Sequence, residues 1–268
     1  MSVELESMYV SFLQGTVPNL WTNVAYPSLK PLASWVADLT TRVAFIKSWL
    51  EIGQPKIFNL PAFYFPQGFM TAVLQLHARK YKLAINTLKF SFQVLSEENQ
   101  MKCERWVRPT GGNKKMLEGG GGGEEKEAKK GETGETGETE HKTENVTMKI
   151  VDDNNISEFD DGVLCSGMFL EGARVALSDE TNVLQLDDQL PRQLVSALPV
   201  IHFLPEPNHV LSPGSYVCPV YKVSTRQGVL STTGMSTNFV VAIELPRGAH
   251  TSSYWVLRGT AALLNLDV

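Results

Sequence analysis

Cysteine is scarce in this sequence, which has only Cys103, Cys165 and Cys218 among its 268 residues. Their number is odd and their spacing is wide, which is not the pattern of a small domain held together by disulfides. We therefore expect reduced thiols, no disulfide and a cytosolic type of compartment.

Long hydrophobic runs and an excess of basic residues are also missing. No run of about 18 apolar residues occurs, and the N-terminus lacks the basic start and apolar core of a signal peptide. The formal net charge is −5, so no large basic face is available to neutralise phosphates. These absences predict a soluble, intracellular chain that binds neither a membrane nor nucleic acid.

Short motifs that would identify an enzyme are absent as well. The sequence has no Gly-x-x-x-x-Gly-Lys-Ser/Thr loop, no Gly-x-Gly-x-x-Gly fingerprint and no Gly-x-Ser-x-Gly elbow. Residues 111–115 come nearest to a phosphate loop, but they lack its spacing and its hydroxyl residue. We therefore expect no catalytic residue and no cofactor in this chain.

Two groups of residues could be read as metal ligands. His202, Glu206 and His209 lie close in sequence, but the two prolines among them exclude a helix that would gather the ligands, so a proline-rich loop is favoured. The acidic stretch 152–161 resembles a calcium loop, but Ser157 stands where such a loop needs glycine. We expect no metal site in either stretch.

Apolar residues recur at helical spacing in the first third of the chain. The clearest pattern covers residues 31–51, and its two apolar stripes indicate either full burial or a position between this chain's core and a missing neighbour. Helices are also expected at 2–14, between a Ser2 cap and Gly15, and at 67–81. The rest of the 31–51 helix surface is assigned to charged residues: Lys30, Asp38, Arg42, Lys47 and Glu51.

Further along the chain the apolar pattern changes from helical spacing to alternation. Residues 88–94 alternate between apolar and polar side chains, which is typical of a half-buried strand. The other predicted strands cover residues 146–151, 163–170, 198–204, 217–223, 239–245 and 254–266. We therefore predict an α+β fold, in which an N-terminal helical segment is followed by an antiparallel β-barrel or sandwich.

A stretch of different composition separates the first two predicted strands. Residues 110–144 are rich in Gly and Glu and nearly free of apolar side chains, so we expect a disordered loop inserted between strands. A tolerated insertion is favoured over a regulatory or docking role. We divide the chain into a helical segment, 1–84, incomplete at its N-terminus, and a β subdomain, 85–268.

The stretch 58–82 connects the two kinds of sequence. Pro61 and Pro66 prevent a helix on their N-terminal side, so a rigid aromatic segment is expected to lead into the helix that follows. In this elbow we expect Phe65 to be buried, and its replacement by Ala would then reduce stability by about 3–5 kcal/mol.

Several collinear motifs resemble the C-terminal domain of dynein heavy chains. They cover residues 17–21, 26–32, 63–69, 74–81, 169–174, 198–201, 218–222 and 230–234. The resemblance extends over nearly the whole chain except 110–144, and the sequence is more similar to axonemal members of the family than to cytoplasmic ones. Departures at 59–62, Asn86 and Met235 affect the subtype rather than the family. The residues that we single out as structural signatures are Trp21, Phe65, Pro66, Gln67, Gly68, Phe69, Glu171, Gly172, Pro219, Tyr221, Thr233 and Gly234.

The resemblance implies a non-catalytic cap that packs on the AAA+ ring of the same heavy chain and stabilises or regulates its motility. In that family ATP with Mg²⁺ and the microtubule bind to other parts of the motor, so this chain would meet microtubules and other dynein subunits only indirectly. The implied location is the cytoplasm and cytoskeleton, in the axoneme of a cilium or flagellum. The alternative is a free-standing β-barrel module that binds a protein or a small ligand in a pocket beside the elbow.

Overall fold

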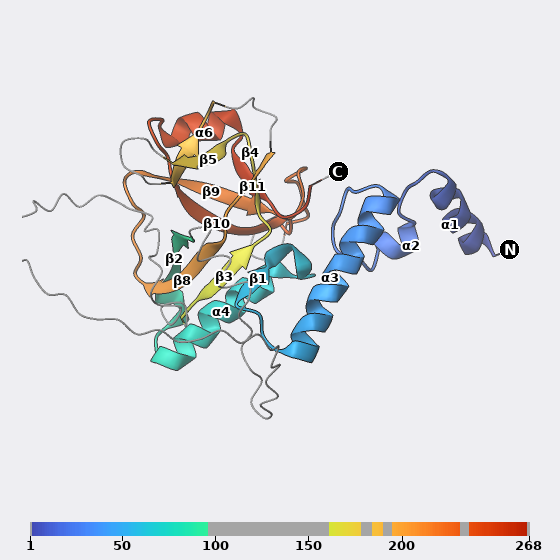
Figure 1. The fold of residues 1–268 in the computed structure, drawn as a ribbon, viewed down its shortest axis with the longest axis horizontal. Helices are drawn as coiled ribbons and strands as arrows, with labels where there is room; N and C mark the ends of the chain where they lie inside the picture. Colours follow the sequence, from blue (N-terminus) through green and yellow to red (C-terminus); the bar gives the residue numbers. More distant parts are fainter. Residues whose placement is uncertain (1, 96–160, 178–183, 190–194, 231–235, 267–268) are drawn as a thin grey trace, which may run out of the picture.

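The computed structural model describes residues 2–95, 161–177, 184–189, 195–230 and 236–266, and Figure 1 shows their arrangement. The predicted strand at 146–151 and the 110–144 insertion lie outside these residues. The helices are α1 (Val3–Leu13), α2 (Asn19–Thr22), α3 (Leu32–Ile52), α4 (Pro66–Tyr81) and α6 (Ser252–Arg258), with 3-10 turns η1 (Leu60–Ala62) and η2 (Ile85–Thr87). The strands are β1 (Ile57–Asn59), β2 (Leu88–Val94), β3 (Val163–Ser166), β4 (Phe169–Glu171), β5 (Arg174–Leu177), β6 (Leu184–Asp187), β7 (Val195–Ala197), β8 (Ile201–Pro207), β9 (Ser215–Tyr221), β10 (Phe239–Pro246) and β11 (Ala261–Leu263).

The three long N-terminal helices begin and end at the local signals of the sequence. The Ser2 hydroxyl accepts a hydrogen bond from the backbone N–H of Leu5 (3.3 Å), which caps α1. Helix α3 ends at Gly53 and α4 starts at Pro66, where a missing N–H does no harm. The predicted helices at 2–14, 31–51 and 67–81 are therefore confirmed to within one or two residues at each end.

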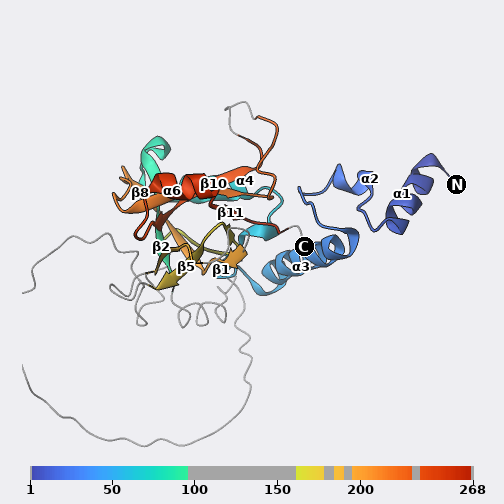
Figure 2. The ribbon, with the colours of Figure 1, turned by 90° about the horizontal axis from the view of Figure 1, so that it is seen from above.

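The N-terminal helices project from the rest of the molecule. In two perpendicular views, α1, α2 and the first part of α3 lie beside the sheets rather than over them (Figures 1 and 2). Only the C-terminal half of α3 approaches β1 and α4. None of the described helices is both long enough and apolar enough to cross a bilayer.

Two main sheets hold the β part of the molecule together. One has the strand order β1-β3-β8-β2 and the other β10-β9-β11-β4-β7, while β5 and β6 form a separate pair. The pairing is antiparallel except between β1 and β3 and between β11 and β9. Strand β1 therefore adds a piece of the N-terminal segment to a sheet that is otherwise built later in the chain. The predicted division at residue 84 stays a prediction.

One apolar core lies between the sheets. Phe203 and Ile201 of β8, Leu170 of β4, Ile243 of β10 and Trp255 of α6 are completely buried within it. The described strands form a sandwich and no closed barrel. The predicted α+β class is confirmed, with the sandwich as the form of its β part.

Two of the predicted strands are wrong in part. Residues 254–266 do not form one strand, because the Thr251 hydroxyl caps helix α6 and Gly259, at φ 73°, ends it before β11 begins. The predicted strand 163–170 is broken into β3 and β4 at Gly167, whose φ of 84° turns the chain. A Cβ on Gly167 would lie 2.4 Å from Asn59 Oδ1, so this turn packs tightly on the elbow.

The proline-rich loop predicted for His202, Glu206 and His209 is wrong in part. Residues 201–207 form β8, which overlaps the predicted strand 198–204, and only His209 lies in the loop that follows. Pro205 lies opposite Phe90 of β2 in an antiparallel pair, so the prolines prevent a helix but do not prevent a strand. His202 is 2% exposed, and its Nε2 is 2.7 Å from the carbonyl oxygen of Asp161. Among the described residues, no three His, Cys, Asp or Glu side chains are arranged to hold a metal ion.

Candidate functional site

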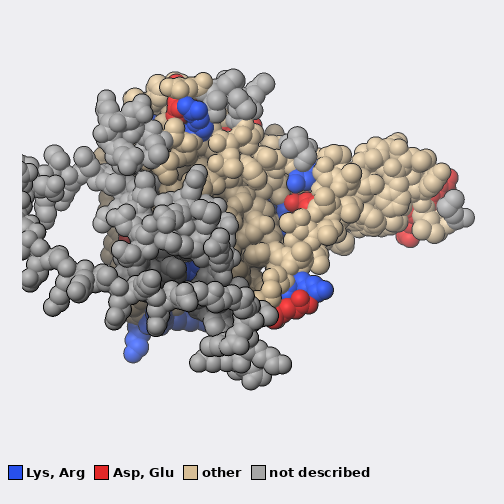
Figure 3. Space-filling model, viewed as in Figure 1, with Lys and Arg blue, Asp and Glu red and all other residues tan. Residues whose placement is uncertain are grey.

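Helix α3 turns its apolar stripe toward solvent. Val36, Leu39, Val43 and Leu50 are 43%, 36%, 56% and 82% exposed, and we call them the α3 outer face. Their spacing of three, four and seven residues places them on one side of the helix. In the space-filling view the projecting helices show few charged residues (Figure 3). A surface of this kind is typical of a contact with a partner.

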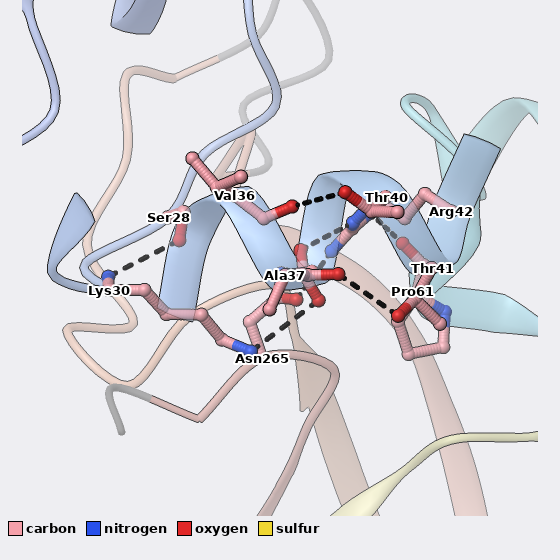
Figure 4. A network of polar contacts seen from close by, with 10 residues as sticks. Ser28, Lys30, Val36, Ala37, Thr40, Thr41, Arg42, Pro61 and Asn265 are labelled. Atoms are coloured by element: carbon pink, nitrogen blue, oxygen red, sulfur yellow. Dashed lines mark hydrogen bonds and ion pairs between the residues drawn. The ribbon is translucent and has the colours of Figure 1, made fainter. Parts of the chain in front are cut away.

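Two charged residues of α3, Asp38 and Arg42, are largely buried, contrary to our prediction for them. Arg42 is 6% exposed, and its guanidinium donates from Nε to Asp38 (2.6 Å). The same group donates from Nη1 to the Pro61 carbonyl and from Nη2 to Asn265 Oδ1, the latter at 2.6 Å (Figure 4). One side chain thus joins α3, the elbow and the segment after β11; we call this the Arg42 junction.

Charge balance at the Arg42 junction comes from two further groups. Burial alone would raise the pKa of Asp38, but the nearby Tyr26 hydroxyl, then the hydrogen bond and charge of Arg42, and finally the charge of Lys30, 3.4 Å away, hold it below its usual value. Tyr26 lies under the guanidinium, with its ring centroid 3.6 Å from Arg42 Cζ. Burial raises the pKa of the Tyr26 hydroxyl, so the ring stays neutral beside the ion pair.

Aromatic stacking links the projecting helices to this junction. Trp35 of α3 stacks on Tyr26 (6.0 Å between centroids) and on Trp21 of α2 (5.7 Å). Trp21 in turn contacts Phe12 of α1 at 5.5 Å. The predicted signature residue Trp21 therefore connects α1 and α2 to α3.

A second aromatic cluster forms the elbow. Phe63 stacks on Phe69 of α4 (4.3 Å), while Trp49 of α3 packs edge-on against Phe58 of β1 (5.2 Å) and against Phe63 (6.2 Å). Each side chain comes from a different element, so the rings fix α3, β1 and α4 against one another. The elbow expected at 58–82 exists, and Phe69 belongs to its core.

Phe65 is not part of that core, and the expectation that it is buried is wrong. It is 61% exposed, because the chain turns before Pro66 and directs the neighbouring Phe63 inward instead. Its ring lies over Gly68, where a Cβ would approach the ring to 2.4 Å. Phe65 is therefore a surface aromatic residue held in place by a glycine.

The first turn of α4 is attached to the second sheet. Gln67 donates from Nε2 to the carbonyl oxygens of Thr237 (3.0 Å) and Phe239 (2.7 Å), at the start of β10. Pro66 is buried directly before it. Tyr221, at the end of β9, packs edge-on against Phe239 at 6.0 Å. Gln67 and Tyr221 are thus brought together around Phe239, and both are structural.

The remaining predicted signature residues lie elsewhere. Glu171 of β4 forms an ion pair with Arg226, and the Gly172 carbonyl accepts from Arg258 Nε at 2.6 Å, so these two hold the end of α6. Pro219 pairs with Ala242 within the β9–β10 ladder. Thr233 and Gly234 lie outside the described residues.

A groove of about 460 Å³ opens beside the elbow, between the C-terminal half of α4 and strands β1 and β3. Trp49, Phe58 and Phe69 line it together with Leu76. Leu76 is 64% exposed. Lys80 on the rim pairs with Asp161, which also accepts a hydrogen bond from the Tyr81 hydroxyl.

The two cysteines within the described ranges lie in the interior, and His209 bridges two strands. Cys165 and Cys218 are free, fully buried thiols, and burial raises the pKa of Cys218 to about 12. His209 lies between two carboxylates, with Nδ1 3.1 Å from Glu206 and Nε2 2.8 Å from Glu244. Because its nitrogens face opposite partners, this group ties β8 to β10 and does not enclose a ligand.

Sequence reasoning missed the long-range contacts of Arg42, Lys222 and Asn265. A signal for the first was present, since Asp38 and Arg42 stand four residues apart, the spacing of an ion pair on one helix face. Asn265 carried no comparable signal, because its contact with Arg42 spans 223 residues. Lys222 stands in a motif that the resemblance used only as a signature.

In the part of the molecule that the structure describes, a β-sandwich carries a helical arm whose apolar face on α3 is exposed, while Asp38 and Arg42 of the same helix are largely buried. The fold defines an α+β domain with an exposed apolar helix face. The protein belongs to the family defined by the C-terminal domain of dynein heavy chains, whose model matches residues 1–264. The predicted resemblance is confirmed.

The relatives are axonemal dynein heavy chains. The sequence is 40% identical over 267 residues to dynein axonemal heavy chain 6 of Homo sapiens, and 37% identical over 268 residues to dynein axonemal heavy chains 1 and 3 of Mus musculus. Each match covers 100% of this sequence but only 5–6% of the relative. The 268 residues therefore correspond to a small part of each of these relatives.

Proposed function

We propose that this domain is a non-catalytic cap that packs on the AAA+ ring of its own heavy chain and stabilises or regulates the motor. The α3 outer face carries this proposal. A helix that buries an arginine and an aspartate while exposing its apolar stripe is poorly explained by one isolated chain, because burial of that stripe would be favourable. The missing neighbour is a surface of the same heavy chain.

The parent motor would supply the chemistry that this domain lacks. As in the family, ATP and Mg²⁺ would bind in the ring and the microtubule would bind elsewhere, with this domain acting on movement only through the ring. The axonemal names of its relatives support a location of the parent protein in a cilium or flagellum. Other dynein subunits and microtubules are indirect partners.

The experiment uses the full heavy-chain motor with Leu39→Glu and Val43→Glu together. Two buried carboxylates at the contact would separate the domain from the ring, because each would lose its water without gaining a partner. We expect the ATPase rate and the microtubule gliding velocity to change. In the isolated domain, the free energy of unfolding should change by less than about 0.5 kcal/mol per site, since both residues face solvent there.

A matched control places the same substitutions in the loop after β8, where Val210 and Leu211 are 81% and 53% exposed. Val210→Glu with Leu211→Glu should leave ATPase rate and velocity unchanged. If the α3 variant behaves like this control in the motor, the proposed contact is wrong.

The groove beside the elbow favours a second candidate function, the binding of an apolar ligand. Its aromatic lining and its volume of about 460 Å³ are within the range of small-molecule sites. Ala72→Trp would fill it. Stoichiometric uptake of an apolar fluorescent probe by the unmodified protein, lost in Ala72→Trp, would support this function, and no uptake by either would exclude it.

A further inference from the structure

Lys222 is a buried lysine that directly follows β9. Its N–H donates to the carbonyl of Asn238 (2.9 Å) and its own carbonyl accepts from the N–H of Asn265 (3.0 Å). The backbone is therefore fixed on both sides. The residue is only 9% exposed, and this burial lowers the pKa of its ammonium group.

The ammonium of Lys222 has no carboxylate at ion-pair distance within the described ranges. The contact that the structure does give it is aromatic, since Nζ lies 5.6 Å from the centroid of the Phe65 ring. A cation over a ring face is stabilised, but less than by a buried carboxylate. Arg42, the nearby cation, already donates to Asp38, Pro61 and Asn265, so it does not compete for an incoming anion.

Two exposed aromatic side chains stand beside this lysine. Tyr64 and Phe65 are 60% and 61% exposed, although their neighbours Phe63 and Pro66 pack inward. Tyr64 and Lys222 both line a small cavity of about 10 Å³, which has room for about one water molecule. The feature is therefore a contact surface rather than a ligand pocket.

We propose that Tyr64, Phe65 and Lys222 form a second docking surface that receives an Asp or Glu side chain flanked by apolar residues. The acidic segment belongs to the rest of the heavy chain, and the inference rests on the proposed function. A single ammonium beside the Phe65 ring, with Tyr64 close by, matches one carboxylate with apolar neighbours. A phosphate would be better served by a guanidinium fork, and the nearby Arg42 is fully engaged.

The first test replaces Phe65 or Val43, one at a time, by a photoreactive phenylalanine in the full heavy chain. We expect both positions to cross-link to the ring, with an Asp or Glu in the peptide attached to position 65. A cross-link from position 43 alone, or a position-65 peptide without a carboxylate, would overturn this inference and leave the proposed function standing. No cross-link to the ring from either position would overturn both.

The second test measures how much the positive charge of Lys222 contributes to binding of the domain to the ring. A protease site is inserted before this domain in the full heavy chain, and release of the domain from the ring is followed after cleavage. Lys222→Met, which keeps the length of the side chain, should speed release about tenfold at low salt, with Lys222→Arg much closer to the original rate. Lys222→Met should not lower the melting temperature of the domain, because it removes a buried charge.

A release rate for Lys222→Met equal to that of the original protein would contradict the proposal. A lowered melting temperature would also contradict it, since that would make Lys222 a structural residue. Tyr64→Ala, at a surface position, should speed release without unfolding the domain.

Discussion

Arg42 Nη2 donates to Asn265 Oδ1 at 2.6 Å, a contact between helix α3 and the segment that follows β11. The two residues are 223 positions apart, and the Pro61 carbonyl accepts from the same guanidinium. This contact connects distant parts of the chain, because the helical arm, the elbow and the segment after β11 all meet at the Arg42 guanidinium. It also leaves the apolar stripe of α3 on the outside.

Replacing Arg42 by Ala should lower the free energy of unfolding by about 2–4 kcal/mol, as measured by urea denaturation. The loss arises because Asp38, the Pro61 carbonyl and Asn265 would lose their donor in a largely buried place. Arg42→Lys, which keeps the charge but not the planar fork, should lose less. Lys47→Ala serves as the control, because its ion pair with Glu51 is exposed and contributes less than about 0.5 kcal/mol. An equal change in the free energy of unfolding for Arg42→Ala and Lys47→Ala would show that the Arg42 junction does not stabilise the fold.

Substitution at the two aromatic positions Phe58 and Phe65 should reduce stability to very different extents. Phe58 is 5% exposed and packs against three other rings, so Phe58→Ala should cost about 3–5 kcal/mol through the cavity it leaves. Phe65→Ala should cost less than about 1 kcal/mol, because Phe65 faces solvent. Urea unfolding of both variants measures this difference. A loss for Phe65→Ala comparable to that for Phe58→Ala would place Phe65 in the core after all.

The helices could be predicted from the sequence because their signals are local. Ser2, Gly53 and Pro66 mark their ends by capping and backbone geometry that depend on a few neighbouring residues. The same kind of signal was overlooked at α6. Thr251 caps the Tyr254 N–H at 3.3 Å and Gly259 ends the helix, and these two outweigh the β-favouring composition of 254–266.

The inner face of α3 could not be predicted, for a physical reason. Periodicity identifies the sides of a helix, but which side is covered depends on residues far away in the sequence. Asn265 and Pro61 supply the acceptors that make burial of Arg42 favourable, and neither is marked by a motif for that role. In the same way, the proline pattern located the elbow but did not show that Phe63 rather than Phe65 turns inward.

Gly167 should be intolerant of any side chain. It has a φ of 84°, and a Cβ there would lie 2.4 Å from Asn59 Oδ1 and 2.6 Å from Pro61 Cδ. Gly167→Ala should therefore lower the free energy of unfolding by about 2 kcal/mol or more, combining backbone strain with displacement of the elbow.

Gly214→Ala is the matched control for this substitution, since a Cβ at Gly214 would meet nothing within 4 Å. It should change the stability by no more than about 0.5 kcal/mol. Thermal melts of the two variants, run side by side, decide the matter. If Gly167→Ala has the same melting temperature as Gly214→Ala, the turn between β3 and β4 is not packed tightly against the elbow.

His202 should make the stability of the domain depend on pH near neutrality. Burial lowers the pKa of His202 below its ordinary value of 6.5, which the unfolded protein retains. Below pH 6.5 the unfolded state therefore binds a proton that the folded state excludes, so the free energy of unfolding falls as the pH decreases. The contribution is fully present above that pH, and the slope for one proton cannot exceed about 1.4 kcal/mol per pH unit.

Urea unfolding at about pH 7.5 and about pH 5.5 measures this slope. His202→Gln provides the comparison, because its side-chain amide can donate to the Asp161 carbonyl, which lies 2.7 Å from His202 Nε2, and yet does not titrate. The variant should be less stable overall at about pH 7.5, but its stability should fall less between the two pH values. The carboxylates titrate at lower pH and affect both proteins equally, so the difference in slopes isolates one side chain. Identical slopes would mean that His202 takes up its proton without unfolding, and its burial between β3 and β2 would then have no consequence for stability.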